Sequence, residues 1–164
     1  MQKLHDEFHR ARLTAKGQTE LTMLYFSDFN IQHTPRSHAL IFDVCAALGI
    51  ELGYHQDWIK ANQWVSKTKY NQTFTMPTEP KRVYKAIQGM FSGTRTTDVI
   101  NTLLNKCYLD VAIKIVEAEY ASSPYQLYRI HQGNDIWISN SKRHWATGLY
   151  VTLVRMGLIF NSRK

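Results

Sequence analysis

Residues 43–60, DVCAALGIELGYHQDWIK, decide the fold that we expect for this chain, because their spacing is that of two short helices joined by a tight turn. Val44 and Leu48 stand four residues apart on one helical face, and Gly49 is placed to end the first helix. Trp58 and Ile59 supply the next apolar pair, one helix further on. The stretch therefore predicts a helical hairpin, either a structural part of the core or a functional unit.

This spacing resembles a generic helix-turn-helix, and the DVCAALGI core is similar to the BRO-N and KilA-N type DNA-binding domains of phage regulators. The resemblance covers residues 36–66 and implies that the second helix lies in the major groove of double-stranded DNA. It departs from the pattern at His55, which stands where such a motif normally buries an aliphatic side chain. A histidine buried there needs a hydrogen-bond partner.

The resemblance also assigns roles to individual polar side chains, since amides read base edges and cations hold phosphates. The expected base contacts are Gln56, Lys60, Asn62 and Gln63. The expected phosphate contacts are Arg36, Lys67, Lys69, Arg95, Lys142 and Arg143. The competing interpretation is that the polar residues of the second helix only face solvent.

Size and charge agree with a folded protein that binds a polyanion. The chain has 164 residues, of which 44% are hydrophobic and 20% charged, so a folded core is expected. Its formal net charge of +7 favours a nucleic-acid partner. We expect a single globular domain over residues 1–164, with a sub-division into 1–76 and 77–164 as the alternative.

Residues 67–80, with two prolines and four threonines, are expected to be extended or looped, as a strand or wing after the second helix of the hairpin. Besides that second helix, the hydrophobic patterns place six helical regions along the chain. They are residues 2–16, 20–32, 36–48, 78–91, 97–120 and 142–156, and a strand over residues 23–26 is the alternative to the second of them. Apolar and polar residues alternate in the two stretches YQLYRIH and DIWISNS, which meet at His131–Asn134. This alternation predicts a β-hairpin, with a bulge near Leu127. The expected fold class is mostly α (α+β). We expect a compact helical domain with a helix-turn-helix and one C-terminal β-hairpin.

Other motifs predict little chemistry. His5 and His9 share a helical face and could hold a metal, but no third ligand can be named from the sequence. His131, Asp135 and His144 have the residue types of a phosphodiesterase site without its spacing. Because the chain has no Gly-rich phosphate loop, serine elbow, CxxC pair or clustered carboxylate set, we expect no enzyme, no metal and no cofactor.

Cysteines 45 and 107 lie apart in apolar helical contexts, and no apolar run approaches the roughly 20 residues that span a bilayer. The expected location is therefore cytoplasmic, without a membrane.

The leading hypothesis is a sequence-specific DNA-binding transcriptional regulator, phage or mobile-element encoded, that occupies an operator as a homodimer. The apolar stripe from Val99 to Val116 is the candidate dimer face, with a core role as its alternative. A second hypothesis is a host-directed inhibitor or adaptor that binds a protein or ribonucleoprotein through a basic, aromatic surface. A third is a small metal-dependent nuclease.

Overall fold

The computed structural model describes residues 20–90, 96–121, 126–140 and 143–161, and the chain divides into two compact units. One unit consists of Met1–Asp28 and Asn101–Lys164, and the other of Phe29–Ile100. The helix expected over residues 2–16 lies outside the described residues. The expectation of one globular domain stays a prediction.

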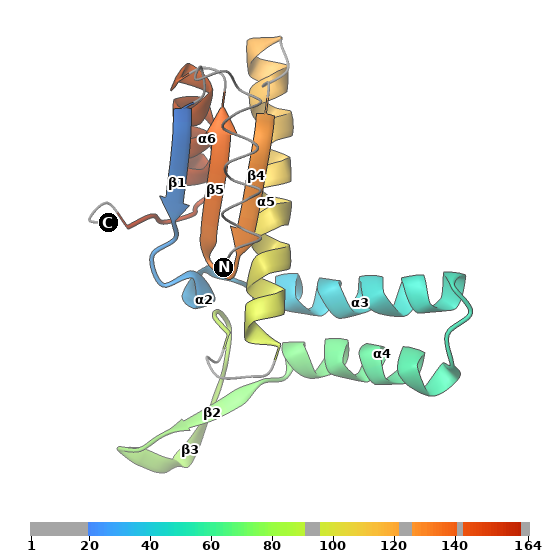
Figure 1. Ribbon diagram of the computed structural model, residues 1–164. Coiled ribbons are helices and arrows are strands. Elements are labelled where there is room, and N and C mark those ends of the chain that lie inside the picture. Colours follow the sequence, from blue (N-terminus) through green and yellow to red (C-terminus); the bar gives the residue numbers. More distant parts are fainter. Residues whose placement is uncertain (1–19, 91–95, 122–125, 141–142, 162–164) are drawn as a thin grey trace, which may run out of the picture. The chain divides into compact units, whose positions relative to one another are not determined.

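An antiparallel sheet forms the centre of the first unit (Figure 1). Strand β5 (Asp135–Asn140) lies between β1 (Glu20–Tyr25) and β4 (Gln126–Gln132). The β4–β5 hairpin is as predicted, and its register shifts between Gln126 and Tyr128, where the bulge was expected. The fold is therefore α+β, but the hairpin is part of a larger sheet.

Helices α5 (Thr97–Tyr120) and α6 (Arg143–Arg155) cover one face of this sheet (Figure 1). Ile136 and Ile138 alternate along β5 with half-buried residues, which is the pattern of a strand that buries one face. The two helices add six buried apolar side chains to the core of this unit: Leu109, Ala112 and Val116 of α5, and Trp145, Leu149 and Leu153 of α6.

The prediction of a helix over residues 20–32 is wrong for its first half. Glu20–Tyr25 is strand β1, which pairs along its length with β5. The local pattern fitted a helix and a strand about equally well, and pairing with a strand more than a hundred residues away decided between them. Only the short helix α2 (Phe29–Gln32) remains of the predicted one.

A long helical hairpin dominates the second unit, with α3 (Pro35–Glu51) antiparallel to α4 (Gln56–Tyr70) (Figure 1). Thr34 caps α3 as its flanking sequence predicts: its hydroxyl accepts a hydrogen bond from the Ser37 N–H at 3.1 Å, and Pro35 occupies the first helical position.

The pair is not a helix-turn-helix. That motif crosses its helices at a steep angle of about 90–120°, whereas these two helices pack along their length (Figure 1). Gly49 does not end α3 but lies buried within it, where a Cβ would stand 2.4 Å from the Trp58 ring. Small residues at this interface, Gly49 with Ala39 and Ala46, let the helices approach closely.

The helix-turn-helix interpretation also implies buried side chains that the structure exposes. Val44 and Leu48 point to the surface, with 49% and 48% of their area exposed. His55 is not buried: it is the N-cap of α4, and its Nδ1 accepts a hydrogen bond from the Asp57 N–H at 3.3 Å. The histidine therefore needs no partner in the core.

A second hairpin follows α4: its first strand lies in residues 67–80, which the sequence predicted as extended or looped, and its second strand replaces the start of the helix predicted over residues 78–91. Strand β2 (Thr73–Met76) pairs with β3 (Glu79–Lys85), and the register shifts between Thr75 and Met76. Phe74 lies opposite Tyr84, and such cross-strand aromatic pairs stabilise strands over helix. Strand pairing thus overrode the helical pattern predicted over residues 78–91.

A histidine without hydrogen bonds is buried in this second unit. Both ring nitrogens of His38 are buried and have no partner among the described residues, and the ring meets that of His33 edge to face at 5.4 Å between centroids. Burial, followed by the charges of His33 and Lys69, lowers the pKa of His38 from 6.5 to about 4. The folded protein therefore holds this imidazole neutral.

Because the unfolded chain takes up a proton at His38 that the folded chain resists, the free energy of unfolding should fall as the pH falls from 6.5 to 4. His38→Leu removes this dependence and leaves the rest of the chain unchanged. In urea titrations, we expect the wild type to lose about 2 kcal/mol more than the variant between pH 7 and pH 4.5. Equal losses would contradict a neutral buried imidazole.

Within the described parts of the chain, no helix is long and apolar enough to cross a membrane.

Candidate functional site at the β4–β5 turn

The tight turn between β4 and β5 is the most strongly held polar feature of the first unit. It consists of Gly133 and Asn134, and Gly133 has a left-handed backbone with φ of 56°. The Gly133 N–H donates to the Thr102 hydroxyl of α5 at 2.9 Å. The turn is therefore anchored to the helix that covers the sheet.

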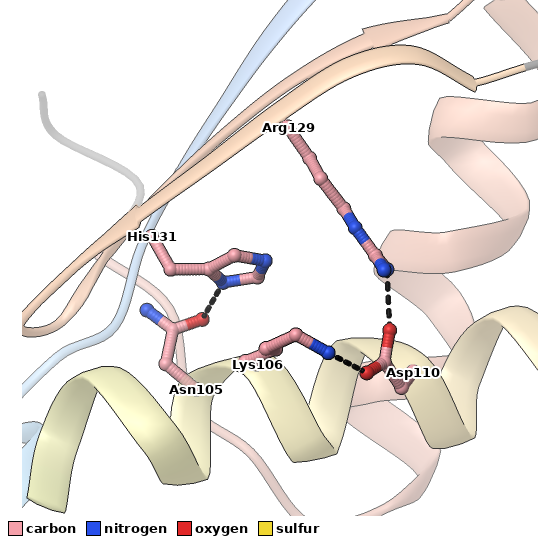
Figure 2. A network of polar contacts seen from close by, with 5 residues as sticks. All are labelled: Asn105, Lys106, Asp110, Arg129 and His131. Carbon is pink, nitrogen blue, oxygen red and sulfur yellow. Dashed lines mark hydrogen bonds and ion pairs between the residues drawn. The ribbon is translucent and has the colours of Figure 1, made fainter.

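Asn105, one turn further along α5, completes this anchor. Its side chain is fully buried, and its amide Nδ2 donates to the carbonyl oxygens of Gly133 at 3.2 Å and Asp135 at 3.1 Å. Its Oδ1 lies 3.1 Å from Nδ1 of His131 on β4 (Figure 2). One amide thus holds both ends of the turn and the strand that enters it.

These contacts fix the tautomer of His131. The Asn105 Nδ2 faces two carbonyls, so its Oδ1 faces the imidazole and can only accept. The proton of His131 therefore resides on Nδ1, and Nε2, which is buried with no partner among the described residues, is bare. Burial and then the Arg129 charge lower the pKa of His131 to about 4, which keeps the ring neutral.

A charged cluster lies beside this pair between the same two elements (Figure 2). Asp110 of α5 accepts hydrogen bonds from Lys106, at 2.5 Å, and from Arg129 of β4. Burial raises the pKa of Asp110, but the bonds from Lys106 and Arg129 outweigh that effect and lower the pKa overall. The cluster adds a second link between α5 and β4.

The anchored turn places Asp135 at one end of the sheet. Asp135 begins β5, and its partners in the register are Gln132 on β4 and Tyr25 on β1. Asp28 follows three residues after Tyr25, is exposed, and has a left-handed backbone with φ of 46°. Asp28 thus follows β1 beyond the end at which Tyr25 pairs with Asp135, and Tyr25 rather than a carboxylate stands opposite Asp135.

The residues expected to contact bases lie elsewhere, on α4. Gln56, Lys60 and Gln63 are exposed and share one helical face. Asn62 is half-buried, and its Nδ2 donates to the Trp58 carbonyl at 2.9 Å. The structure thus groups three of the four residues and turns the fourth toward its own helix.

The residues expected to contact phosphates are scattered. Arg36, Lys67 and Arg143 are exposed, on α3, α4 and α6. Lys69 is buried, with its ammonium 5.6 Å from the centre of the Phe42 ring. Arg95 and Lys142 lie outside the described residues, as do His5 and His9.

The supposed phosphodiesterase set is only partly assembled. His131 and Asp135 share the hairpin, while the ring of His144 packs near Tyr120 and Trp145 at the start of α6. Sequence reasoning missed Thr102 and Asn105, which carry the site. A polar residue on the buried face of α5, next to Leu104, was the available signal, because a buried amide needs partners.

Comparison with known proteins identifies the class. The family model described as viral RNA-directed RNA-polymerase matches residues 4–164. The RNA-directed RNA polymerase of Penicillium chrysogenum virus (isolate Caston/2003) is 30% identical over 111 residues, which cover 68% of this chain and 9% of that protein. The probable RNA-directed RNA polymerase of Leishmania RNA virus 1 - 1 is 29% identical over 141 residues, covering 85% of this chain and 14% of that protein.

Solved structures of RNA-dependent RNA polymerases share the fold of this chain. A crystal structure of the RNA-dependent RNA polymerase of a human picorbirnavirus superposes with a TM-score of 0.61 at 19% identity, covering 87% of this chain and 25% of that one. The crystal structure of the insertion loop deletion mutant of that polymerase superposes with a TM-score of 0.60 at 18% identity, covering 92% of this chain and 29% of that one. The chain therefore belongs to the viral RNA-directed RNA polymerase family, and it spans a small part of the length of the relatives that it matches.

These matches correct the functional hypotheses. The chain is not a BRO-N or KilA-N type regulator, and double-stranded DNA is not its expected partner, because its relatives are RNA-directed RNA polymerases. The expectation of no enzyme was wrong for the same reason. The inhibitor or adaptor and the nuclease do not match the family either.

Removing the Asn105 amide should release the turn. Asn105→Ala leaves two carbonyls and the His131 Nδ1–H unpaired in the interior, so we expect a loss of about 2–4 kcal/mol in the free energy of unfolding. Urea unfolding measures this loss, and hydrogen exchange should show faster exchange of the turn amides.

Lys106→Gln is the matched control on the same helix, since its exposed ion pair should change stability by less than about 1 kcal/mol. If Asn105→Ala were as mild as this control, the amide would not be the anchor of the turn.

Proposed function

We propose that this chain forms part of the catalytic domain of a viral RNA-directed RNA polymerase, which extends an RNA strand on an RNA template. Its family supports this proposal, and so does the fold that it shares with a solved polymerase. The observation that carries the assignment to a site is the anchored turn, because Asn105 and Thr102 hold Asp135 at the end of the sheet. The expected partners are an RNA template and nucleoside triphosphates.

Polymerases of this class imply divalent metal ions, and the residues at the sheet end can be tested for their fit. Within the described ranges, no group of three His, Cys, Asp or Glu side chains could hold a metal ion. Mg²⁺ in polymerase sites is commonly bound through only one or two carboxylates, with substrate phosphates and water completing the shell. Asp135 and Asp28 supply carboxylates of this type, and substrate phosphates and water would have to complete the shell.

In this proposal, Asp135 and Asp28 hold Mg²⁺ through their carboxylates. The bound metal would stabilise negative charge on the phosphate at which the new bond forms. The chain's own contribution is position: the Asn105 amide fixes the backbone carbonyl of Asp135, and the neutral His131 fixes the amide. A rigid turn spares the site the cost of ordering Asp135 when substrate binds.

Asp135→Asn tests this assignment. Replacing the carboxylate by an amide keeps its shape and removes its charge, so we expect nucleotide incorporation into RNA to fall at least about 100-fold. Mn²⁺ binding, followed by electron paramagnetic resonance, should weaken in the same variant and gives a readout that does not require turnover.

Asp43→Asn, an exposed carboxylate on α3, is the control and should leave both readouts unchanged. Unaltered Mn²⁺ binding and incorporation in Asp135→Asn would contradict the placement of the metal at this turn.

A further inference from the structure

The β2–β3 hairpin joins aromatic and cationic side chains on one exposed ribbon. The Phe74 and Tyr84 rings stack across the two strands, with centroids 5.6 Å apart and planes at 21°. The Arg82 guanidinium lies over the Tyr84 ring at 5.0 Å from its centre. Both rings are only half-buried, so the stack reaches the surface.

The charge around this stack is strongly one-sided. From Thr73 to Lys85 the hairpin has three basic residues, Lys81, Arg82 and Lys85, and one acidic residue, Glu79. That carboxylate is already engaged, since it accepts a hydrogen bond from the Tyr84 hydroxyl and lies 3.7 Å from Arg82. Lys81 and Lys85 are exposed, and no carboxylate among the described residues pairs with them.

This combination matches the chemistry of an unpaired nucleic-acid strand. Aromatic side chains stack on the faces of unstacked bases, and flanking cations hold the phosphates. Bases within a duplex are already stacked and offer no free face, so the ribbon favours a single strand. A two-stranded ribbon is also marginally stable by itself, and its exposed aromatic surface adds little to the core.

We propose that the β2–β3 hairpin binds single-stranded RNA, with Phe74, Tyr84 and Arg82 forming a platform for a base and with Lys81 and Lys85 contacting phosphates. The choice of RNA rests on the proposed polymerase function. The site is separate in sequence from the β4–β5 turn, so binding at the hairpin and synthesis at the turn can be measured independently.

Fluorescence anisotropy with a labelled 12-nucleotide oligouridylate and the full chain tests the platform. Tyr84→Leu removes the ring and should weaken binding roughly tenfold, with the salt dependence unchanged. Tyr84→Phe retains the ring and loses only the hydroxyl, so it should bind like the wild type. Equal affinities for wild type and Tyr84→Leu, or equal losses in both variants, would overturn the platform.

Replacing the two lysines of the hairpin should change the salt dependence of RNA binding. In the double variant Lys81→Gln/Lys85→Gln, the slope of log affinity against log salt should become shallower by about 1.4, since each phosphate contact on a single strand contributes about 0.7. Lys114→Gln, on an exposed position of α5, is the charge control and should keep the wild-type slope. An unchanged slope in the double variant would remove the phosphate contacts from the proposal.

Two further measurements separate this proposal from its alternatives. An RNA duplex should compete poorly for the hairpin, and competition equal to that of the single strand would overturn the choice of ligand. Asp43→Asn, which lies outside both the hairpin and the β4–β5 turn, should bind the oligouridylate as the wild type does. If Asp135→Asn synthesised RNA normally while the hairpin variants lost binding, the placement of the metal at the β4–β5 turn would fail and the hairpin site would stand.

Discussion

The hydrogen bonds of the buried Asn105 amide are the interaction on which the first unit depends. This one side chain joins α5 to two carbonyls of the β4–β5 turn and to His131. Each bond satisfies a group that would otherwise be costly to bury, so the amide is hard to replace. The same bonds give Asp135 a fixed position, which links the stability of the sheet to the proposed chemistry at its end.

The second unit depends on close helix packing instead. Small side chains in α3 allow α4 to approach, and the cost is that larger apolar residues such as Leu40, Val44 and Leu48 face outward. Large exposed apolar area often marks an interaction surface. The polar hairpin β2–β3 extends from this rigid pair, and its charge and stacked rings suit a strand of RNA better than a duplex.

The sequence was sufficient for features set by local signals and insufficient for those set by distant pairing. Thr34–Pro35 fixed the start of α3, and the alternation around Gly133 predicted the β4–β5 hairpin. Strand β1 could not be found locally, because its partner β5 lies more than a hundred residues away. The helix-turn-helix interpretation failed at Gly49, whose role is close packing against Trp58 and not a turn. Asn105 went unnoticed since a buried polar residue shows its partners only in three dimensions.

The protonation state of His131 tests the central claim most directly. Long-range proton–nitrogen correlation spectra at pH 6.5 should show a neutral ring with its proton on Nδ1, because the Asn105 oxygen can only accept and burial lowers the pKa to about 4. A proton on Nε2, or a charged ring at that pH, would contradict the account, since the amide could then not hold the turn and the histidine together.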